Sequence, residues 1–228
     1  MTKKIGLLLS GCGVYDGAEI HESVLALLAI AEQGAEAVCI GVDHPQYHVI
    51  DHRSGQEMSE PRNMLVEAAR IARGAITEIS QVEAADLDGL VIPGGFGSAK
   101  NLTTWAFAGP EGEILPSVKR LIRDLQQAGK PIAALCVSPV VVAKALQGSG
   151  TSAQMTLGSD QAPSPYEIDQ FAAGLTATGM RAVMKKKDEI HVDSKHKIVS
   201  APCYMMETDL PTLRKNISDA VAALIQFA

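Results

Sequence analysis

Short apolar runs alternate with segments that carry one apolar helical face, and this alternation constrains the fold more than any other feature of the chain. The runs with the length and composition of strands are residues 5–9, 37–42, 76–79, 90–92 and 132–135, of which residues 76–79 are expected at an edge of the sheet. The helical segments are residues 18–34, 62–73, 113–128 and 209–228. Strands that are joined through helices form a mainly parallel sheet covered on both faces. We therefore expect one α/β domain over residues 1–228, a three-layer sandwich with small hairpin insertions, the first at residues 47–58.

Composition and charge exclude several classes of protein. The 228 residues carry a net charge of −6, and the basic cluster Lys185–Lys187 is typical of a solvated turn rather than of a nucleic-acid site. The sequence contains no signal-peptide pattern and no apolar run of membrane length, so we expect a cytoplasmic protein with no membrane partner. The four cysteines lie far apart, which predicts free thiols and neither a disulfide framework nor a metal site.

Residues 130–142 predict a buried strand, a sharp turn and the start of a helix, with Cys136 at the bend. A thiol in that position lies near the positive end of a helix, where free N–H groups stabilise a thiolate. This is the arrangement of a nucleophile elbow, although the Gly-x-Ser-x-Gly form of that motif is absent. The alternative is that Cys136 is a small core residue, as free cysteines commonly are.

Three loops that follow predicted strands have unusual sequences, and in a parallel sheet such loops collect at one edge. They are residues 11–17, residues 93–97 and the bend at Cys136. The second loop offers backbone N–H groups with little side-chain obstruction, and next to a thiolate those near Gly94 and Gly95 would stabilise an oxyanion. A plain glycine turn is the alternative. We expect the three loops to meet in one pocket.

Glu19 lies at the start of the first predicted helix, directly after the first of these loops. A carboxylic acid that burial keeps protonated can share its proton with Cys136. The alternative is a helix cap, because Asp16 and Glu19 have the spacing of a capping box. No histidine occupies an obvious position for a Cys–His pair, and helical geometry turns His21 away from the face of Glu19.

The glycines of the first loop also allow a dinucleotide-binding interpretation, which we disfavour. Gly11, Gly13 and Gly17 depart from the Gly-x-Gly-x-x-Gly spacing. In addition, Asp16 and Glu19 would place negative charge where a pyrophosphate must bind. We therefore expect no nucleotide cofactor.

Several long motifs resemble those of one known family. Residues 10–22, SGCGVYDGAEIHE, are similar to the signature of the ElbB-type proteins, which are often called isoprenoid biosynthesis glyoxalases. Residues 62–63, 69–74 and 93–102 resemble its other blocks, so that the resemblance covers nearly the whole chain. That family belongs to the ThiJ/PfpI superfamily, and the resemblance implies a flavodoxin-like fold of the class I glutamine amidotransferase-like type.

The resemblance also implies a role for each candidate residue. Cys136 would be the nucleophile and Glu19 its carboxylate partner. The turn at Gly94 and Gly95, together with Val137, would form the oxyanion site. Val137 marks a departure, because peptidases of similar fold carry a histidine directly after the elbow cysteine. Without that imidazole, hydrolysis of peptides or glutamine is disfavoured, since an amine or ammonia leaving group needs an acid.

By the same resemblance, the implied activity is conversion of glyoxal to glycolate through a hemithioacetal on Cys136, with no metal, glutathione or other cofactor, or a related deglycase activity. A homodimer is expected, and Lys100 and Asn101 are candidate substrate contacts, or else residues that pack the next helix. The alternative function is a non-catalytic thiol that senses oxidants or carbonyls, or binds a metabolic partner. An amidotransferase or a dinucleotide enzyme is a third class that we do not expect.

Overall fold

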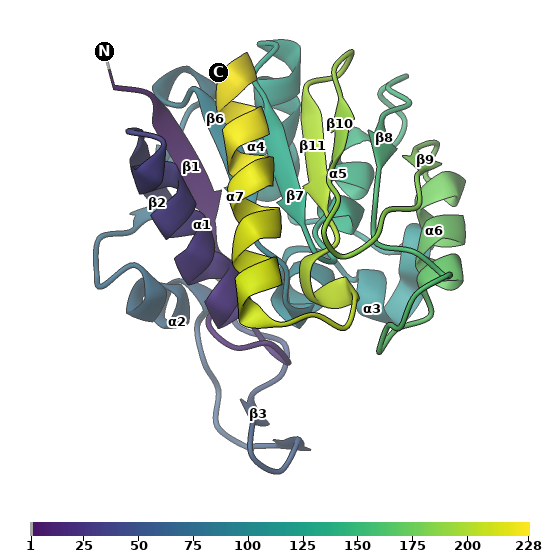
Figure 1. Cartoon of the computed structure of the whole chain (residues 1–228). Coiled ribbons are helices and arrows are strands. Elements are labelled where there is room, and N and C mark those ends of the chain that lie inside the picture. The colour runs from purple at the N-terminus through teal and green to yellow at the C-terminus, as the bar shows by residue number, and fades with distance from the viewer. Residues whose placement is uncertain (1) are drawn as a thin grey trace.

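A seven-stranded sheet forms the centre of the computed structural model, which describes residues 2–228 (Figure 1). Its strands are β1 (Lys4–Leu8), β2 (Glu36–Gly41), β5 (Thr77–Glu78), β6 (Gly89–Ile92), β7 (Ile132–Leu135), β10 (His191–Asp193) and β11 (Ile198–Ala201). They lie in the order β10-β11-β7-β6-β1-β2-β5. All neighbours pair in parallel except β10 and β11, which are antiparallel. The predicted, mainly parallel sheet is therefore confirmed.

Helices cover both faces of this sheet. They are α1 (Ile20–Glu32), α2 (Met64–Ile71), α3 (Trp105–Ala108), α4 (Pro116–Gln127), α5 (Pro139–Leu146), α6 (Ile168–Ala177) and α7 (Leu210–Phe227). In Figure 1, α1 and α7 lie side by side in front of the sheet, whereas α4 and α5 pack against each other behind it. The three-layer sandwich expected from the sequence is thus the observed architecture.

Two small two-stranded sheets are added to this core. β3 (Ile50–Asp51) and β4 (Gln56–Glu57) form the predicted hairpin, which projects from the lower end of the molecule in Figure 1. β8 (Gln154–Met155) pairs in parallel with β9 (Arg181–Ala182). β8 was not predicted, because it follows a polar stretch and is too short to show an alternating pattern.

The predicted helix boundaries differ from the observed ones by a few residues. The helix expected from residue 113 begins at Pro116, since proline fits the first helical position, where its missing N–H costs nothing. The segment from residue 98, expected to be partly helical, contains a turn of π-helix over Ser98–Leu102, followed by α3.

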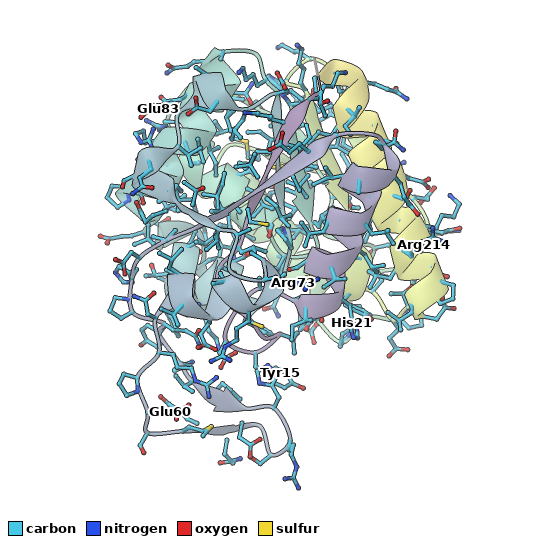
Figure 2. The ribbon with its side chains drawn as sticks, turned by 90° about the vertical axis from the view of Figure 1, so that its left-hand side faces the viewer. Tyr15, His21, Glu60, Arg73, Glu83 and Arg214 are labelled. Atoms are coloured by element: carbon cyan, nitrogen blue, oxygen red, sulfur yellow. The ribbon has the colours of Figure 1, made fainter. Side chains whose placement is uncertain are left out.

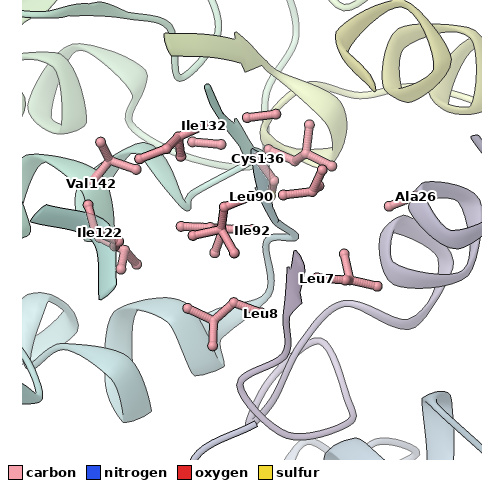
Figure 3. Packing of buried hydrophobic residues seen from close by; sticks show 14 of the residues in the cluster. Leu7, Leu8, Ala26, Leu90, Ile92, Ile122, Ile132, Cys136 and Val142 are labelled. Carbon is pink, nitrogen blue, oxygen red and sulfur yellow. The ribbon is translucent and has the colours of Figure 1, made fainter. Parts of the chain in front are cut away.

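The two middle strands β6 and β7 are buried at every residue, which explains their continuous apolar sequences. Figure 3 shows this core from close by, with Leu90, Ile92, Ile132 and Cys136 among the side chains drawn. Since β1, β6 and β7 are parallel, their carboxyl ends lie at one edge of the sheet. That is the edge from which the hairpin projects (Figure 1). Within residues 2–228, no helix is long and apolar enough to cross a membrane.

Candidate active site

Cys136 occupies a strained turn between β7 and α5. Its φ angle of 57° lies in the left-handed region, which costs a non-glycine residue about 1 kcal/mol or more. The backbone N–H of Cys136 donates to the carbonyl oxygen of Ala201 at 2.9 Å, and the hydroxyl of Ser138 donates to the carbonyl oxygen of Pro93. These bonds hold the turn against the neighbouring strand ends. The strand, turn and helix expected around Cys136 are all present.

The three loops that we expected to meet are joined by backbone hydrogen bonds. The N–H of Glu19 donates to the carbonyl oxygen of Gly94 at 2.9 Å, and the N–H of Gly97 donates to that of Gly17 at 2.9 Å. The start of α1 and the glycine turn after β6 are therefore one unit. This unit lies against the bend at Cys136.

A narrow pocket opens over the Cys136 thiol. Its cavity volume of about 20 Å³ slightly exceeds the ~10–15 Å³ that one water molecule needs. Apolar and aromatic side chains form most of its wall. The lining residues are Val14, Glu19, Gly95, Phe96, Cys136, Val137, Tyr166, Phe171, Tyr204 and Met205. The pocket thus brings together four of the predicted site residues, one of which is the nucleophile candidate.

The carboxyl group packed against the thiol belongs to Glu22, whereas the sequence predicted Glu19 in this position. Glu22 is fully buried, and its Oε2 accepts a hydrogen bond from the N–H of Gly94 at 2.8 Å. A methyl group built on Gly94 would lie 2.6 Å from Sγ of Cys136 and 2.7 Å from Oε2 of Glu22, so these three residues pack tightly. The second oxygen, Oε1, accepts from the N–H of Tyr204 at 3.3 Å. Both carboxyl oxygens of Glu22 are therefore fixed beside the sulfur.

Glu19 is instead the N-cap of α1. Its side chain turns back to accept a hydrogen bond from the N–H of Glu22 at 2.7 Å, as N-cap residues do. The expected capping role of Asp16 is also wrong, because Asp16 accepts from the N–H of Ile50 at 2.7 Å and so ties the hairpin to the first loop. Glu19 still lines the pocket. The structure therefore assigns the contact with Cys136 to Glu22, one helical turn further along the chain.

Burial controls the protonation of this pair. Burial, reinforced by the nearby charge of Glu19, raises the pKa of Glu22 to about 8. Burial also raises the pKa of Cys136 well above its ordinary value, and the Glu22 carboxylate raises it further. The expected thiolate is therefore not the resting form at neutral pH, because the effect of the helix end does not outweigh burial.

Two backbone N–H groups face the sulfur. Those of Gly95 and Val137 lie beside Cys136 and oppose the rise in its pKa. Gly94, which we expected to contribute as well, is not free to do so, because its N–H is bonded to Glu22. The φ angle of Gly95 is 91°, and a side chain there would collide with the backbone at Gly17, so this position requires glycine.

Lys100 and Asn101, the two candidate substrate contacts, do not line this pocket. Asn101 is buried and donates to the carbonyl oxygens of Ser10 and Asp16 at 3.0 and 2.8 Å. Lys100 donates to the carbonyl oxygen of Tyr15 at 3.1 Å. Both side chains hold the first loop in place, and both line a separate cavity away from Cys136.

The sequence missed three polar groups at the site. Glu22 lies one turn after Glu19, a spacing that puts both on one helix face, and this was the available signal. Tyr166 and Tyr204 come from distant segments and gave no signal. Burial raises the pKa of Tyr166 to about 12, with the charge of Cys136 as the next cause, so its hydroxyl stays protonated. Among residues 2–228, no cluster of side chains could hold a metal ion.

The comparisons with known proteins agree with this fold. The model of the DJ-1/PfpI family matches residues 12–157, which is more than half of the chain. The human "Glutamine amidotransferase-like class 1 domain-containing protein 3, mitochondrial" is 41% identical over 98% of this chain and 83% of its own length. The "ES1 protein homolog, mitochondrial" of Rattus norvegicus is 40% identical over 98% of this chain and 82% of its own length.

Solved structures show the same architecture. An isoprenoid biosynthesis protein with amidotransferase-like domain from Ehrlichia chaffeensis has a TM-score of 0.88 and 32% identity, and the match covers 99% of both chains. DJ-1beta of Drosophila melanogaster has a TM-score of 0.56 at 20% identity over all of this chain and 97% of its own, and this likeness concerns the fold alone.

The names of the relatives correct one expectation. We expected a cytoplasmic protein, but relatives at 40–41% identity over nearly the whole chain are named as mitochondrial proteins, which contradicts that expectation. The expectation of the family, in contrast, is confirmed at the level of the superfamily. On the family match and the identities to its relatives, the chain belongs to the DJ-1/PfpI family, the ThiJ/PfpI group of class I glutamine amidotransferase-like proteins.

Proposed function

We propose that this protein is an ElbB-type member of the family and converts glyoxal to glycolate without a cofactor. The observation that carries the proposal is the contact between the Cys136 thiol and the buried carboxyl group of Glu22. The N–H groups of Gly95 and Val137 are directed at the same point. A nucleophile, a proton acceptor and an oxyanion site are the groups that thiol addition to an aldehyde needs.

The size of the pocket supports a small substrate. With about 20 Å³ over the sulfur, the pocket admits one carbonyl group at a time. Its wall includes Phe96, Phe171 and Met205, which exclude water from the reacting atoms. The neutral hydroxyl of Tyr166 is available as a donor to the second carbonyl oxygen. A compact planar dicarbonyl fits these features better than a glycated protein does.

In the first step, Cys136 adds to one aldehyde carbon. The ionised form of Glu22 accepts the thiol proton while the sulfur–carbon bond forms, and the carbonyl oxygen becomes an alkoxide. The N–H groups of Gly95 and Val137 stabilise this oxygen. Glu22 then returns the proton to the alkoxide, which gives a hemithioacetal, so no proton leaves the pocket in this step.

In the second step, a proton moves from one carbon to the other. Glu19, which lines the pocket, removes the proton from the carbon that carries sulfur, and the electron pair shifts towards the remaining carbonyl group. Return of that proton to the second carbon, together with transfer of the hydroxyl proton from the oxygen of the first carbon to the oxygen of the second, gives a thioester of glycolate on Cys136. Water then cleaves the thioester and frees the thiol. One carbon is oxidised and the other reduced, so the sum is glyoxal plus water to glycolic acid, with no external oxidant.

The sensor alternative has less support. Redox-sensing thiols are accessible and have a lowered pKa, whereas Cys136 is 5% exposed and its pKa is raised. A glutaminase has no support from the pocket, whose lining contains no histidine. The homodimer remains a proposal that rests on the family resemblance, and light scattering of the purified protein tests it.

Glycolate formation from glyoxal tests the proposed function. Wild-type protein is compared with Cys136→Ser and with Cys203→Ser, a matched control that removes another buried thiol. The proposal expects glycolate from the wild type and from the control, and none above background from Cys136→Ser. Equal rates in the wild type and Cys136→Ser would refute it. Glutaminase activity or NAD(P) binding would favour the third class of function.

A further inference from the structure

The reaction proposed above releases one proton per turnover, and this inference rests on that proposal. Glycolic acid is a carboxylic acid and ionises at neutral pH. Glu22, which handles the thiol proton, is fully buried and has no contact with solvent. A bound substrate would also fill the pocket, whose cavity volume is only about 20 Å³. The proton therefore needs a path out that remains open while the pocket is occupied.

Tyr204 connects the pocket to the surface. It lines the pocket, and its backbone N–H donates to Oε1 of Glu22 at 3.3 Å. Its hydroxyl lies 3.0 Å from Nδ1 of His21, which is a hydrogen-bonding distance. His21 is exposed at the start of α1, and Figure 2 shows it on the outside of that helix. The pair therefore extends from the pocket wall to bulk water.

In the hydrogen bond between Tyr204 and His21, either the hydroxyl or the imidazole can be the donor. A neutral His21 with a bare Nδ1 accepts the hydroxyl proton of Tyr204, and a protonated His21 donates to the Tyr204 oxygen. In the second case the hydroxyl proton of Tyr204 is free to point into the pocket. A proton that enters at the phenol oxygen can thus leave at the imidazole, with the phenol never ionised.

We propose that Tyr204 and His21 form a proton relay that carries the proton of each turnover from the pocket to solvent. Histidine suits the outer position, because one ring nitrogen can accept a proton while the other donates one. Glu19, the N-cap of α1, lies near enough to His21 for the two side chains to attract each other when both are charged. Glu22 accepts a hydrogen bond from the backbone N–H of Tyr204 on the pocket side. His21 does not line the pocket itself and reaches it through the hydroxyl of Tyr204.

The first test measures glycolate formation in variants of the relay. His21→Ala is expected to lower kcat about tenfold or more, with KM little changed, because proton transfer and not binding is impaired. Added imidazole should restore the rate of His21→Ala. Tyr204→Phe should show a similar loss that imidazole does not restore. His44→Ala is the control, since His44 contacts the neighbouring carbonyl oxygen of Pro45 and lies outside the pocket.

The outcomes separate the relay from the proposed function. A wild type that makes no glycolate refutes the proposed function. An active wild type whose rate is unchanged by both relay variants, or a loss in His21→Ala that imidazole does not repair, refutes the relay alone.

A second test needs no turnover. The substitution Cys136→Asp places a carboxyl group inside the pocket, and nitrogen NMR then follows Nδ1 of His21. The relay predicts that the Tyr204 hydroxyl turns towards this carboxyl group, so that the Nδ1 signal moves from its wild-type position towards its protonated position. The same substitution in Tyr204→Phe should leave that signal in place. A signal that Cys136→Asp leaves unchanged, or that it moves equally with and without the Tyr204 hydroxyl, would overturn the relay.

Discussion

The N–H of Gly94 donates to Oε2 of Glu22 at 2.8 Å, and this bond fixes a buried carboxyl group directly against the Cys136 thiol. The bond links the glycine turn after β6 to the inner face of α1, so each half of the site holds the other in place. Both oxygens of Glu22 accept backbone N–H bonds, an arrangement that suits the ionised form. Burial opposes that form, and the balance makes this carboxyl group a proton acceptor that works near neutral pH.

The pH dependence of the rate should report on Glu22. With the pKa of Glu22 at about 8, only a minor fraction of the carboxyl group is ionised at neutral pH. We expect kcat/KM for glyoxal to rise with pH and to level off above about 8. Glu22→Gln should lose the rising limb and about 10²- to 10⁴-fold of the rate, the usual contribution of a general base. A Glu22→Gln variant that keeps the wild-type pH profile would exclude this role.

Stability should depend on pH through the same group. The unfolded chain releases the Glu22 proton near 4.5, and the folded chain retains it up to about 8. Between these values the folded state binds more protons, so the stability that this group contributes is complete below 4.5 and is lost as the pH rises through about 8. The loss is on the order of a few kcal/mol.

Urea unfolding at about pH 5 and about pH 9 measures this effect. Glu22→Gln cannot ionise, so its free energy of unfolding should fall less than that of the wild type between the two pH values. The exposed hairpin variant Glu57→Gln serves as control and should follow the wild type. An equal change in the free energy of unfolding between the two pH values in all three proteins would contradict the assignment of a raised pKa to Glu22.

Gly94→Ala should damage the site itself. The new methyl group would lie 2.6 Å from Sγ of Cys136 and 2.7 Å from Oε2 of Glu22, and neither group has room to move. We expect loss of most glycolate formation and destabilisation of about 1–3 kcal/mol from overpacking. Gly148→Ala is a stringent control, because its φ of 75° disfavours alanine, a strain that Gly94 does not have, but nothing lies within 4 Å of the added methyl group. A Gly94→Ala protein that is as active as Gly148→Ala would count against a close thiol–carboxyl contact.

The alternation of strands and helices was sufficient to predict the sheet, its layers and the edge where the site lies. The bend at Cys136 was also predictable, because an apolar strand that is followed within a few residues by a proline at the start of a helix requires a tight turn between the two. The glycine turn could be placed beside it, since both follow neighbouring parallel strands.

The choice between Glu19 and Glu22 could not be made from the sequence. It depends on the residue at which α1 begins, because a start at Ile20 makes Glu19 the N-cap and places Glu22 in the buried part of the first turn. The presence of Tyr166 and Tyr204 in the pocket could not be predicted for another reason. They reach the pocket from segments far along the chain, and no local pattern marks such contacts. The thiolate was mispredicted because burial, which opposes charge, depends on packing that only the folded chain reveals.

The most direct test of the central claim is to follow Cys136 by mass spectrometry while glyoxal is consumed. Wild-type protein is mixed with glyoxal, quenched in acid at successive times and digested, and glycolate is measured in the same samples. Our account predicts an adduct with the mass of one glyoxal on the peptide that contains Cys136, which forms before glycolate and disappears as glycolate accumulates. Glycolate that accumulates while Cys136 stays unmodified, or adducts confined to arginine side chains, would contradict it.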